Sequence, residues 1–265
     1  MVRLVISNQR GGVSKTTTTV TLARIYADQG LRVLAIDTDP QGSLGLVLGL
    51  KPQKYLHDFV VHNCAFGECI VPAAPRVDVL CSSRDTTKIE AVLRGMTGRE
   101  LAFSTLLGLA ETSYDLVLID VAPSINLIQA CSLCYAQRLL IPVAMDMLSL
   151  QGAVASLETG YQLSTMFRKD IRPLALLPVK VDRRFSLTVY VLQALEEISQ
   201  QYHVPLLHPI RTDGTVPRAE RAREFLVDYD AKCKALEDYT TAASQLMELL
   251  NVIPEAEYHE EVLSA

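Results

Sequence analysis

The sequence lacks the two features that would direct it into or across a membrane. Every long apolar segment is broken by polar or charged residues well before the roughly 18 positions that a membrane-spanning helix needs. The first residues open like a strand, and no charged region followed by an apolar one marks a secretory signal. From the sequence we therefore expect a cytoplasmic protein with no membrane partner.

An excess of positive charge is also missing. The chain has 25 Lys and Arg against 30 Asp and Glu, a formal net charge of −5. This balance argues against general attraction to nucleic acid, although a local basic patch is compatible with it. No repeat, low-complexity block or linker divides the 265 residues. We expect one domain over residues 1–253, followed by an acidic and loose tail over residues 254–265.

The cysteines are expected to be reduced, small apolar side chains, because disulfides are rare in the cytosol. Cys131 and Cys134 form a C-x-x-C pair, and Cys64 and Cys69 lie four residues apart, so the four could in principle bind a metal. Their spacing matches no named zinc signature, and Cys131 and Cys134 fall in a predicted helix. We therefore favour the structural interpretation.

The rest of the chain is organised around residues 2–19. An apolar, β-branched run predicts a strand, Gly11 and Gly12 predict a loop, and a helical pattern follows the loop. The strict P-loop pattern, G-x-x-x-x-G-K-[ST], is absent, because Gln9 and Ser14 stand where its two glycines belong.

This loop nevertheless has the chemistry of a phosphate site. Gly11 and Gly12 can adopt positive φ and turn their N–H groups inward, and the following helix adds its own free N–H groups and positive dipole end. Lys15 can reach the β and γ phosphates of a nucleotide, and the Thr16 hydroxyl can complete the shell of a Mg²⁺ ion. The alternative is an ordinary strand-to-helix turn, but such a turn does not need the Lys-Thr pair.

Three aspartates follow predicted strands. Asp37 and Asp39 come after the strand at residues 31–36, and Asp120 ends the strand at residues 116–120. Parallel α/β sheets bind ligands at the carboxyl ends of their strands. Asp37 and Asp39 could instead form only a turn ahead of a helix, but the phosphate loop upstream favours a role in binding. Asp120 has the Walker B pattern, in which the carboxylate holds Mg²⁺, usually through a water.

Strands alternate with helices along the whole chain. Strands are expected at residues 2–6, 31–36, 77–82, 116–120, 138–143, 173–179 and 204–207, and helices at about 15–29, 55–61, 100–111, 125–136, 149–167, 185–201, 217–223 and 234–250. This order predicts an α/β fold with a single doubly wound, mostly parallel sheet and helices on both faces, as in P-loop NTPases.

Three motifs carry a family resemblance. Residues 10–17 read R-G-G-V-S-K-T-T, which resembles the deviant Walker A box of the ParA/MinD family of partition and positioning ATPases. The D-x-D-P-Q-G string at residues 37–42 resembles the second motif of that family. Ala122-Pro123-Ser124 resembles the switch II segment, usually D-x-P-P-S, although Val121-Ala122 departs from the common Thr-Pro. The resemblance covers nearly the whole length, as in short ParA-type members.

The resemblance implies ATP and Mg²⁺ as cofactors and an ATP-dependent homodimer. It assigns nucleotide binding to Arg10, Gly11, Gly12, Val13, Ser14, Lys15, Thr16 and Thr17, and Mg²⁺ to Thr16, Asp37 and Asp120. Its catalytic residues would be Asp39, which holds the attacking water, together with Lys15 and Arg10. The family has a lysine at the Arg10 position that reaches the partner's nucleotide. Arginine differs from it in presenting a planar fork that can bind two phosphate oxygens.

A basic cluster in the C-terminal third suggests non-specific DNA binding by the dimer. It comprises Arg211, Arg218, Arg221 and Arg223. Glu220 and Glu224 interrupt it, so a solvated helix face is the alternative. By resemblance, a ParB-like or cargo-adaptor protein would stimulate hydrolysis, and the ATP-bound protein would associate with the nucleoid to position a plasmid, chromosome or organelle.

Two other functions remain open from the sequence. A MinD-like membrane ATPase needs a basic amphipathic helix at the C-terminus, whereas this chain ends in an acidic stretch. A reductase similar to the nitrogenase iron protein needs an exposed cysteine close behind the Walker B aspartate, whereas Cys131 lies well into the following helix.

Overall fold

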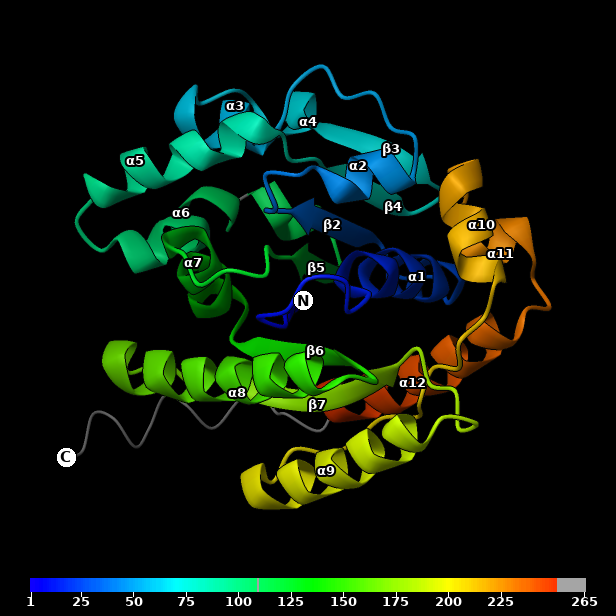
Figure 1. Cartoon of the computed structure of the whole chain (residues 1–265). Helices are drawn as coiled ribbons and strands as arrows, with labels where there is room; N and C mark the ends of the chain where they lie inside the picture. Colours follow the sequence, from blue (N-terminus) through cyan, green and yellow to red (C-terminus); the bar gives the residue numbers. More distant parts are fainter. Residues whose placement is uncertain (109, 252–265) are drawn as a thin grey trace.

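The computed structural model describes residues 1–108 and 110–251, which form a twisted sheet with helices on both faces (Figure 1). The strands are β1 (Val2–Ile6), β2 (Val33–Asp37), β3 (Ile70–Ala74), β4 (Val77–Leu80), β5 (Leu116–Asp120), β6 (Arg138–Ala144) and β7 (Arg172–Val179). The longer helices are α1 (Lys15–Asp28), α7 (Leu127–Ala136), α8 (Met147–Phe167), α9 (Ser186–Tyr202), α10 (Thr215–Ala222) and α12 (Lys234–Asn251). The shorter ones are α2 (Ser43–Val47), α3 (Leu56–Val61), α4 (Phe66–Cys69), α5 (Ile89–Arg94), α6 (Ala102–Leu107) and α11 (Leu226–Tyr229), with 3₁₀ helices η1 (Arg84–Lys88), η2 (Arg99–Leu101) and η3 (Ala110–Ser113).

The predicted fold class is confirmed. The strand order is β3-β4-β2-β5-β1-β6-β7, and every pairing is parallel except that of β3 with β4. The central strands are buried on both faces, which explains their continuous apolar sequences. In β1, Leu4 and Ile6 join one hydrophobic cluster and Val5 joins the other. Helices α1 and α12 cover the first face, and α7 and α8 cover the second.

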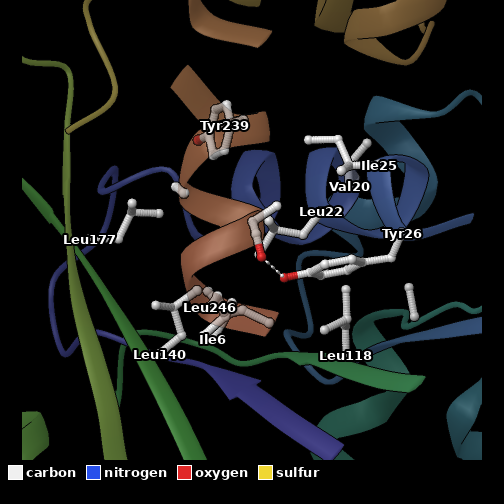
Figure 2. Close-up of a cluster of buried hydrophobic side chains, with 14 of the residues drawn as sticks. Ile6, Val20, Leu22, Ile25, Tyr26, Leu118, Leu140, Leu177, Tyr239 and Leu246 are labelled. Atoms are coloured by element: carbon white, nitrogen blue, oxygen red, sulfur yellow. Dashed lines mark hydrogen bonds between the residues drawn. The ribbon is translucent and has the colours of Figure 1, made fainter. Parts of the chain in front are cut away.

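The first of these clusters is closed by the contact between α1 and α12. Figure 2 shows Leu22 and Tyr26 of α1 facing Leu246 of α12 above the strands. The buried hydroxyl of Tyr26 donates a hydrogen bond to the carbonyl of Ala243 at 2.9 Å, so the polar end of this side chain is satisfied inside the core. This packing fixes the helix that begins at the phosphate loop.

The register brings the predicted site together. Asp120 lies beside Ile6 of β1 on one side and beside Asp37 of β2 on the other. The loop after β1 and the two strand-end carboxylates therefore meet at the same edge of the sheet, as predicted.

Several local predictions differ from the structure. Residues 204–207 form no named strand, because only a single bridge pairs Leu206 with Leu176 of β7. The helix expected at residues 100–111 is divided into η2, α6 and η3, and residue 109 lies outside the described residues. Helices α2, α4, α5 and α11 and strand β3 were not predicted. The tail at 254–265 lies outside the described residues.

Candidate nucleotide site

The loop between β1 and α1 takes the left-handed backbone conformation at two positions. Gly12 has φ +76° and Ser14 has φ +60°, whereas Gly11 is not among the residues with positive φ. The prediction that both glycines provide the turn is thus wrong for Gly11. Ser14 supplies the second left-handed position in the place where the strict P-loop has its last glycine, and a non-glycine residue is strained there.

Asn8 anchors this loop to strand β6 and to the start of helix α8. Its buried side-chain amide donates to the carbonyls of Pro142, at 2.8 Å, and Ser149, at 3.2 Å. Its side-chain oxygen accepts the backbone N–H of Arg10 at 3.0 Å. The backbone at the start of the loop is therefore fixed through three hydrogen bonds to one side chain.

Gln9 explains why the first P-loop glycine is not needed. Its side-chain amide donates to the carbonyl of Ala155 at 2.9 Å and to the hydroxyl of Thr159 at 2.8 Å. Its backbone N–H donates to the hydroxyl of Ser156 at 3.1 Å. All three acceptors lie on α8, so Gln9 holds the loop against that helix, a role that the sequence pattern did not reveal.

Lys15 is buried beneath the loop. Its ammonium group donates to the carbonyls of Asn8, at 3.1 Å, and Arg10, at 2.9 Å. Burial lowers the pKa of Lys15, while the charges of Asp120 and Asp39 oppose that shift. A lysine held by carbonyls is poised to exchange them for phosphate oxygens, which are stronger, charged acceptors.

The two carboxylate oxygens of Asp120 differ in their hydrogen bonding. Oδ2 accepts the hydroxyl of Thr16 at 2.5 Å, and the buried Oδ1 finds no hydrogen-bond partner among the described residues. Burial raises the pKa of Asp120 to about 7. An unpaired buried carboxylate oxygen beside a threonine hydroxyl is the donor set that Mg²⁺ uses in a P-loop, so these residues fit that ion.

Asp37 and Asp39 have different surroundings. Both oxygens of the fully buried Asp37 accept backbone N–H groups, from Asp39 at 2.9 Å and from Leu44 at 3.0 Å. Burial, and then the charge of Asp120, raise the pKa of Asp37 well above its usual value. Asp39 is half-buried, accepts the N–H of Gln41 at 2.9 Å and lines the cavity beside the loop. Asp37 thus shapes the turn that presents Asp39.

A cavity of about 750 Å³ opens in front of the loop, a volume suited to a nucleotide. One wall contains the loop, Asp39 and Pro123, and the other contains residues 210–214 and part of α10. The ammonium of Lys180 lies against the loop and donates a hydrogen bond to the carbonyl of Gly12 at 2.8 Å. This second wall was not predicted as part of the nucleotide site, because it comes from a segment about 200 residues further along the chain.

Glu220 joins the two walls. Its carboxylate accepts the hydroxyl of Thr17 at 2.6 Å, which links α10 to the first turn of α1. The basic helix is therefore in direct contact with the segment predicted to bind the nucleotide.

The four predicted DNA-binding arginines are not equivalent. The Arg211 guanidinium forms ion pairs with Asp238, at 2.7 Å, and Glu237, at 2.9 Å, and the Asp238 carboxylate is almost fully buried. Arg218 donates to the carbonyl of Gly214 at 2.8 Å and is exposed, as are Arg221 and Arg223. Arg211 therefore braces α12, while the other three present their charge on the surface around α10.

Two remaining predictions concern Arg10 and the cysteines. Arg10 is exposed and directly precedes Gly11 and Gly12 of the cavity wall; among the described residues its backbone is fixed by Asn8, and its guanidinium forms no hydrogen bond. Cys131 and Cys134 are both buried in α7, and burial raises the pKa of Cys131 to about 12. Neither thiol is exposed behind Asp120, as a shared iron–sulfur cluster would need.

Comparisons with known proteins show the family of the chain. The family model AAA_31, an AAA domain, matches residues 1–172. The chain belongs to this family. It is a ParA/MinD-type P-loop ATPase, related to partition and positioning ATPases. It is 29% identical to the chromosome partitioning protein ParA of Myxococcus xanthus over 252 residues, which cover 91% of this chain and 86% of that protein.

Solved structures show the same fold. The cobyrinic acid a,c-diamide synthase of Mycobacterium smegmatis with a bound ATP analog and magnesium matches with a TM-score of 0.79 and 26% identity, over 94% of this chain and 95% of that one. The septum site-determining protein MinD of Pyrococcus horikoshii with Mg-ADP matches with a TM-score of 0.77 and 19% identity, over 96% and 99%. None of the helices in the described part of this ATPase has the length and apolar content needed to span a bilayer.

Proposed function

We propose that the protein binds ATP with Mg²⁺ and hydrolyses it to switch between a free and a dimeric, DNA-bound form. The observation that carries the nucleotide part is the buried, unpartnered Oδ1 of Asp120 beside the hydroxyl of Thr16, directly under the phosphate loop. Thr16 and Asp120 would hold the ion, with Asp37 fixing the adjacent turn. When bound, Mg²⁺ would neutralise charge on the β and γ phosphates.

The loop residues 10–17 would surround the phosphates. Lys15 would leave the carbonyls of Asn8 and Arg10 and donate to the β and γ phosphates instead. Asp39 lines the cavity with a half-buried carboxylate whose Oδ2 is not used by Gln41. It would orient the attacking water in line with the γ phosphate and accept a hydrogen bond from it.

Arg10 would act on the nucleotide of a second copy. Its backbone is fixed by Asn8, whereas its long side chain is exposed, and it directly precedes Gly11 and Gly12, which line the cavity. In a face-to-face dimer the guanidinium would donate to two phosphate oxygens of the opposite nucleotide. ATP would then hold the dimer together, and loss of the γ phosphate would release it.

Arg218, Arg221 and Arg223 would bind the DNA backbone, with Arg211 contributing chiefly by fixing α12. The bond between Thr17 and Glu220 supports a link between nucleotide and DNA, because it connects the phosphate-binding helix to α10. Since the likeness extends to a chromosome partitioning protein, a ParB-like or cargo-adaptor activator is the partner we propose, with DNA-bound protein associated with the nucleoid.

The test is binding to a fluorescently labelled, random-sequence DNA duplex. Binding is measured by fluorescence anisotropy with Mg-ATP, with Mg-ADP and without nucleotide. We expect binding with Mg-ATP only, a steep loss with added salt, and weaker binding by Arg218→Ala and Arg221→Ala. Arg94→Ala, which removes an exposed arginine from α5, is the matched control and should bind as the wild type does. DNA binding that does not depend on the nucleotide, or that the Arg218→Ala and Arg221→Ala variants leave unchanged, would contradict the proposal that this patch binds DNA in response to ATP.

A further inference from the structure

We propose a binding site for a divalent first-row transition cation, such as Zn²⁺, formed by His57, Asp58 and His62 at helix α3. The ligand atoms of these three side chains all lie within 4.8 Å of one another. Within residues 1–108 and 110–251, this is the one group of three or more histidine, cysteine or acidic side chains that meets this distance. Two imidazoles and a carboxylate are a donor set that suits Zn²⁺, Ni²⁺ or Co²⁺.

The local fold already orients the carboxylate. Asp58 is the third residue of α3, and its Oδ2 accepts the backbone N–H of Tyr55 at 2.8 Å in a capping box. This bond holds one oxygen and leaves Oδ1 for an ion. Such support from a neighbouring group is typical of metal-binding side chains.

His57 supplies an imidazole that is otherwise unused. It is 7% exposed, and its ring forms no hydrogen bond with the part of the chain that the structure describes. The ring meets that of His62 edge to face, with centroids 4.9 Å apart. Its ring nitrogens are not among the buried, unpartnered polar atoms of the described residues, so solvent, and therefore a cation, can reach a lone pair of this imidazole.

His62 provides the opening of the site. It is the exposed residue that ends α3, so the ion can enter from solvent on its side. Donor atoms around a tetrahedral Zn²⁺ ion lie roughly 3–3.5 Å apart, closer than the 4.8 Å limit seen here. Rotation of the exposed His62 side chain would bring its nitrogen in, and a water would complete the coordination.

Asp85 lies on the 3₁₀ helix η1, which packs against α3. Its carboxylate is paired with the ammonium of Lys88 at 2.7 Å, so it is an outer neighbour of the three ligands and not a fourth one. The presence of imidazole donors separates this site from the oxygen-only surroundings of Asp120, which suit Mg²⁺.

The test is titration of the full chain with Zn²⁺ alone against a chromogenic chelator, in the absence of nucleotide. We expect one equivalent of Zn²⁺ to bind, and His57→Ala and His62→Ala to weaken binding at least about tenfold. Since His62 is exposed, its variant should keep the wild-type circular dichroism spectrum and melting temperature. His203→Asn, at another exposed histidine, and Asp120→Asn should bind Zn²⁺ as the wild type does.

Visible spectra of the protein with Co²⁺ identify the ligands. Weak d–d bands without an intense thiolate-to-cobalt band would support coordination by nitrogen and oxygen. Failure of the wild type to bind one equivalent, unchanged binding by the His62→Ala and His57→Ala variants, or an intense thiolate band that places the metal on cysteine would each overturn the proposal.

Discussion

Replacement of Gly152 by alanine should disturb the phosphate loop from the opposite helix. A Cβ at this position of α8 would lie 2.3 Å from Oδ1 of Asn8 and 3.1 Å from Cβ and the backbone N of Arg10. The first distance is far below van der Waals contact, so the Asn8 side chain must move. Gly152 is thus required for the close approach of the loop to α8.

The loss in free energy of unfolding caused by Gly152→Ala can be estimated from the hydrogen bonds of Asn8. Displacing it breaks its bonds to Pro142, Ser149 and Arg10, each worth about 1 kcal/mol when a buried group loses its partner. Alanine offsets this loss by up to about 1 kcal/mol, because its helix propensity is higher than that of glycine. We therefore expect Gly152→Ala to lower the free energy of unfolding by about 2 kcal/mol and to weaken nucleotide binding.

The assay is urea unfolding of the nucleotide-free protein, paired with titration of a fluorescent ATP analogue. Gly160→Ala in the same helix is the matched control, because its Cβ would meet only Pro173 and Leu139 at 3.6 Å and 3.8 Å, which are ordinary contacts. It should be neutral or stabilising by up to about 1 kcal/mol. Equal stability and nucleotide affinity of the two variants would refute the reasoning.

Three further predictions follow from the site. Ser14→Gly should stabilise the protein by about 1 kcal/mol in urea unfolding, because it relieves the left-handed strain, and a loss of stability would contradict this. Burial raises the pKa of Asp120 to about 7, whereas an unfolded aspartate titrates near 4, so the folded state holds an extra proton between these values. The nucleotide-free protein should therefore lose stability as pH rises from about 4 to about 7. Asp120→Asn should flatten this part of the plot of unfolding free energy against pH, and an unchanged slope in that variant would contradict the role of Asp120. Arg211→Ala should lower the melting temperature more than Arg218→Ala, because it removes the guanidinium that pairs with the buried Asp238 and leaves that carboxylate only the backbone N–H of residue 211 and the ring of His208; equal melting temperatures would argue against the bracing role.

Much of the central sheet could be predicted from local sequence. The apolar runs of β1, β2 and β5 are buried on both faces, and a run of that kind ending in a carboxylate places Asp37 and Asp120 at the ligand-binding edge. These features depend on neighbouring residues along the chain, which periodicity can detect.

The rest depends on contacts between distant segments. In the sequence, Gln9 only departs from the P-loop pattern, which has a glycine at that position. Its structural role could not be predicted, because its hydrogen-bond partners on α8 lie about 150 residues away. Strand β3 was missed because Pro72 lies inside it, and proline is tolerated there only because β3 is an edge strand. Residues 204–207 have the apolar pattern of a strand, yet only Leu206 pairs with β7. Pattern alone does not show which partner a segment will meet.

The most direct test of the account is the mass of the protein in solution with Mg-ATP, Mg-ADP or a slowly hydrolysed ATP analogue, measured by light scattering after size exclusion. We expect the wild type to dimerise only with a triphosphate, Arg10→Ala to stay monomeric with every nucleotide, and Asp39→Ala to remain a dimer in ATP. A wild type that stays monomeric with the analogue while binding it, or an Arg10→Ala variant that dimerises as the wild type does, would contradict a switch closed by Arg10 across two nucleotides.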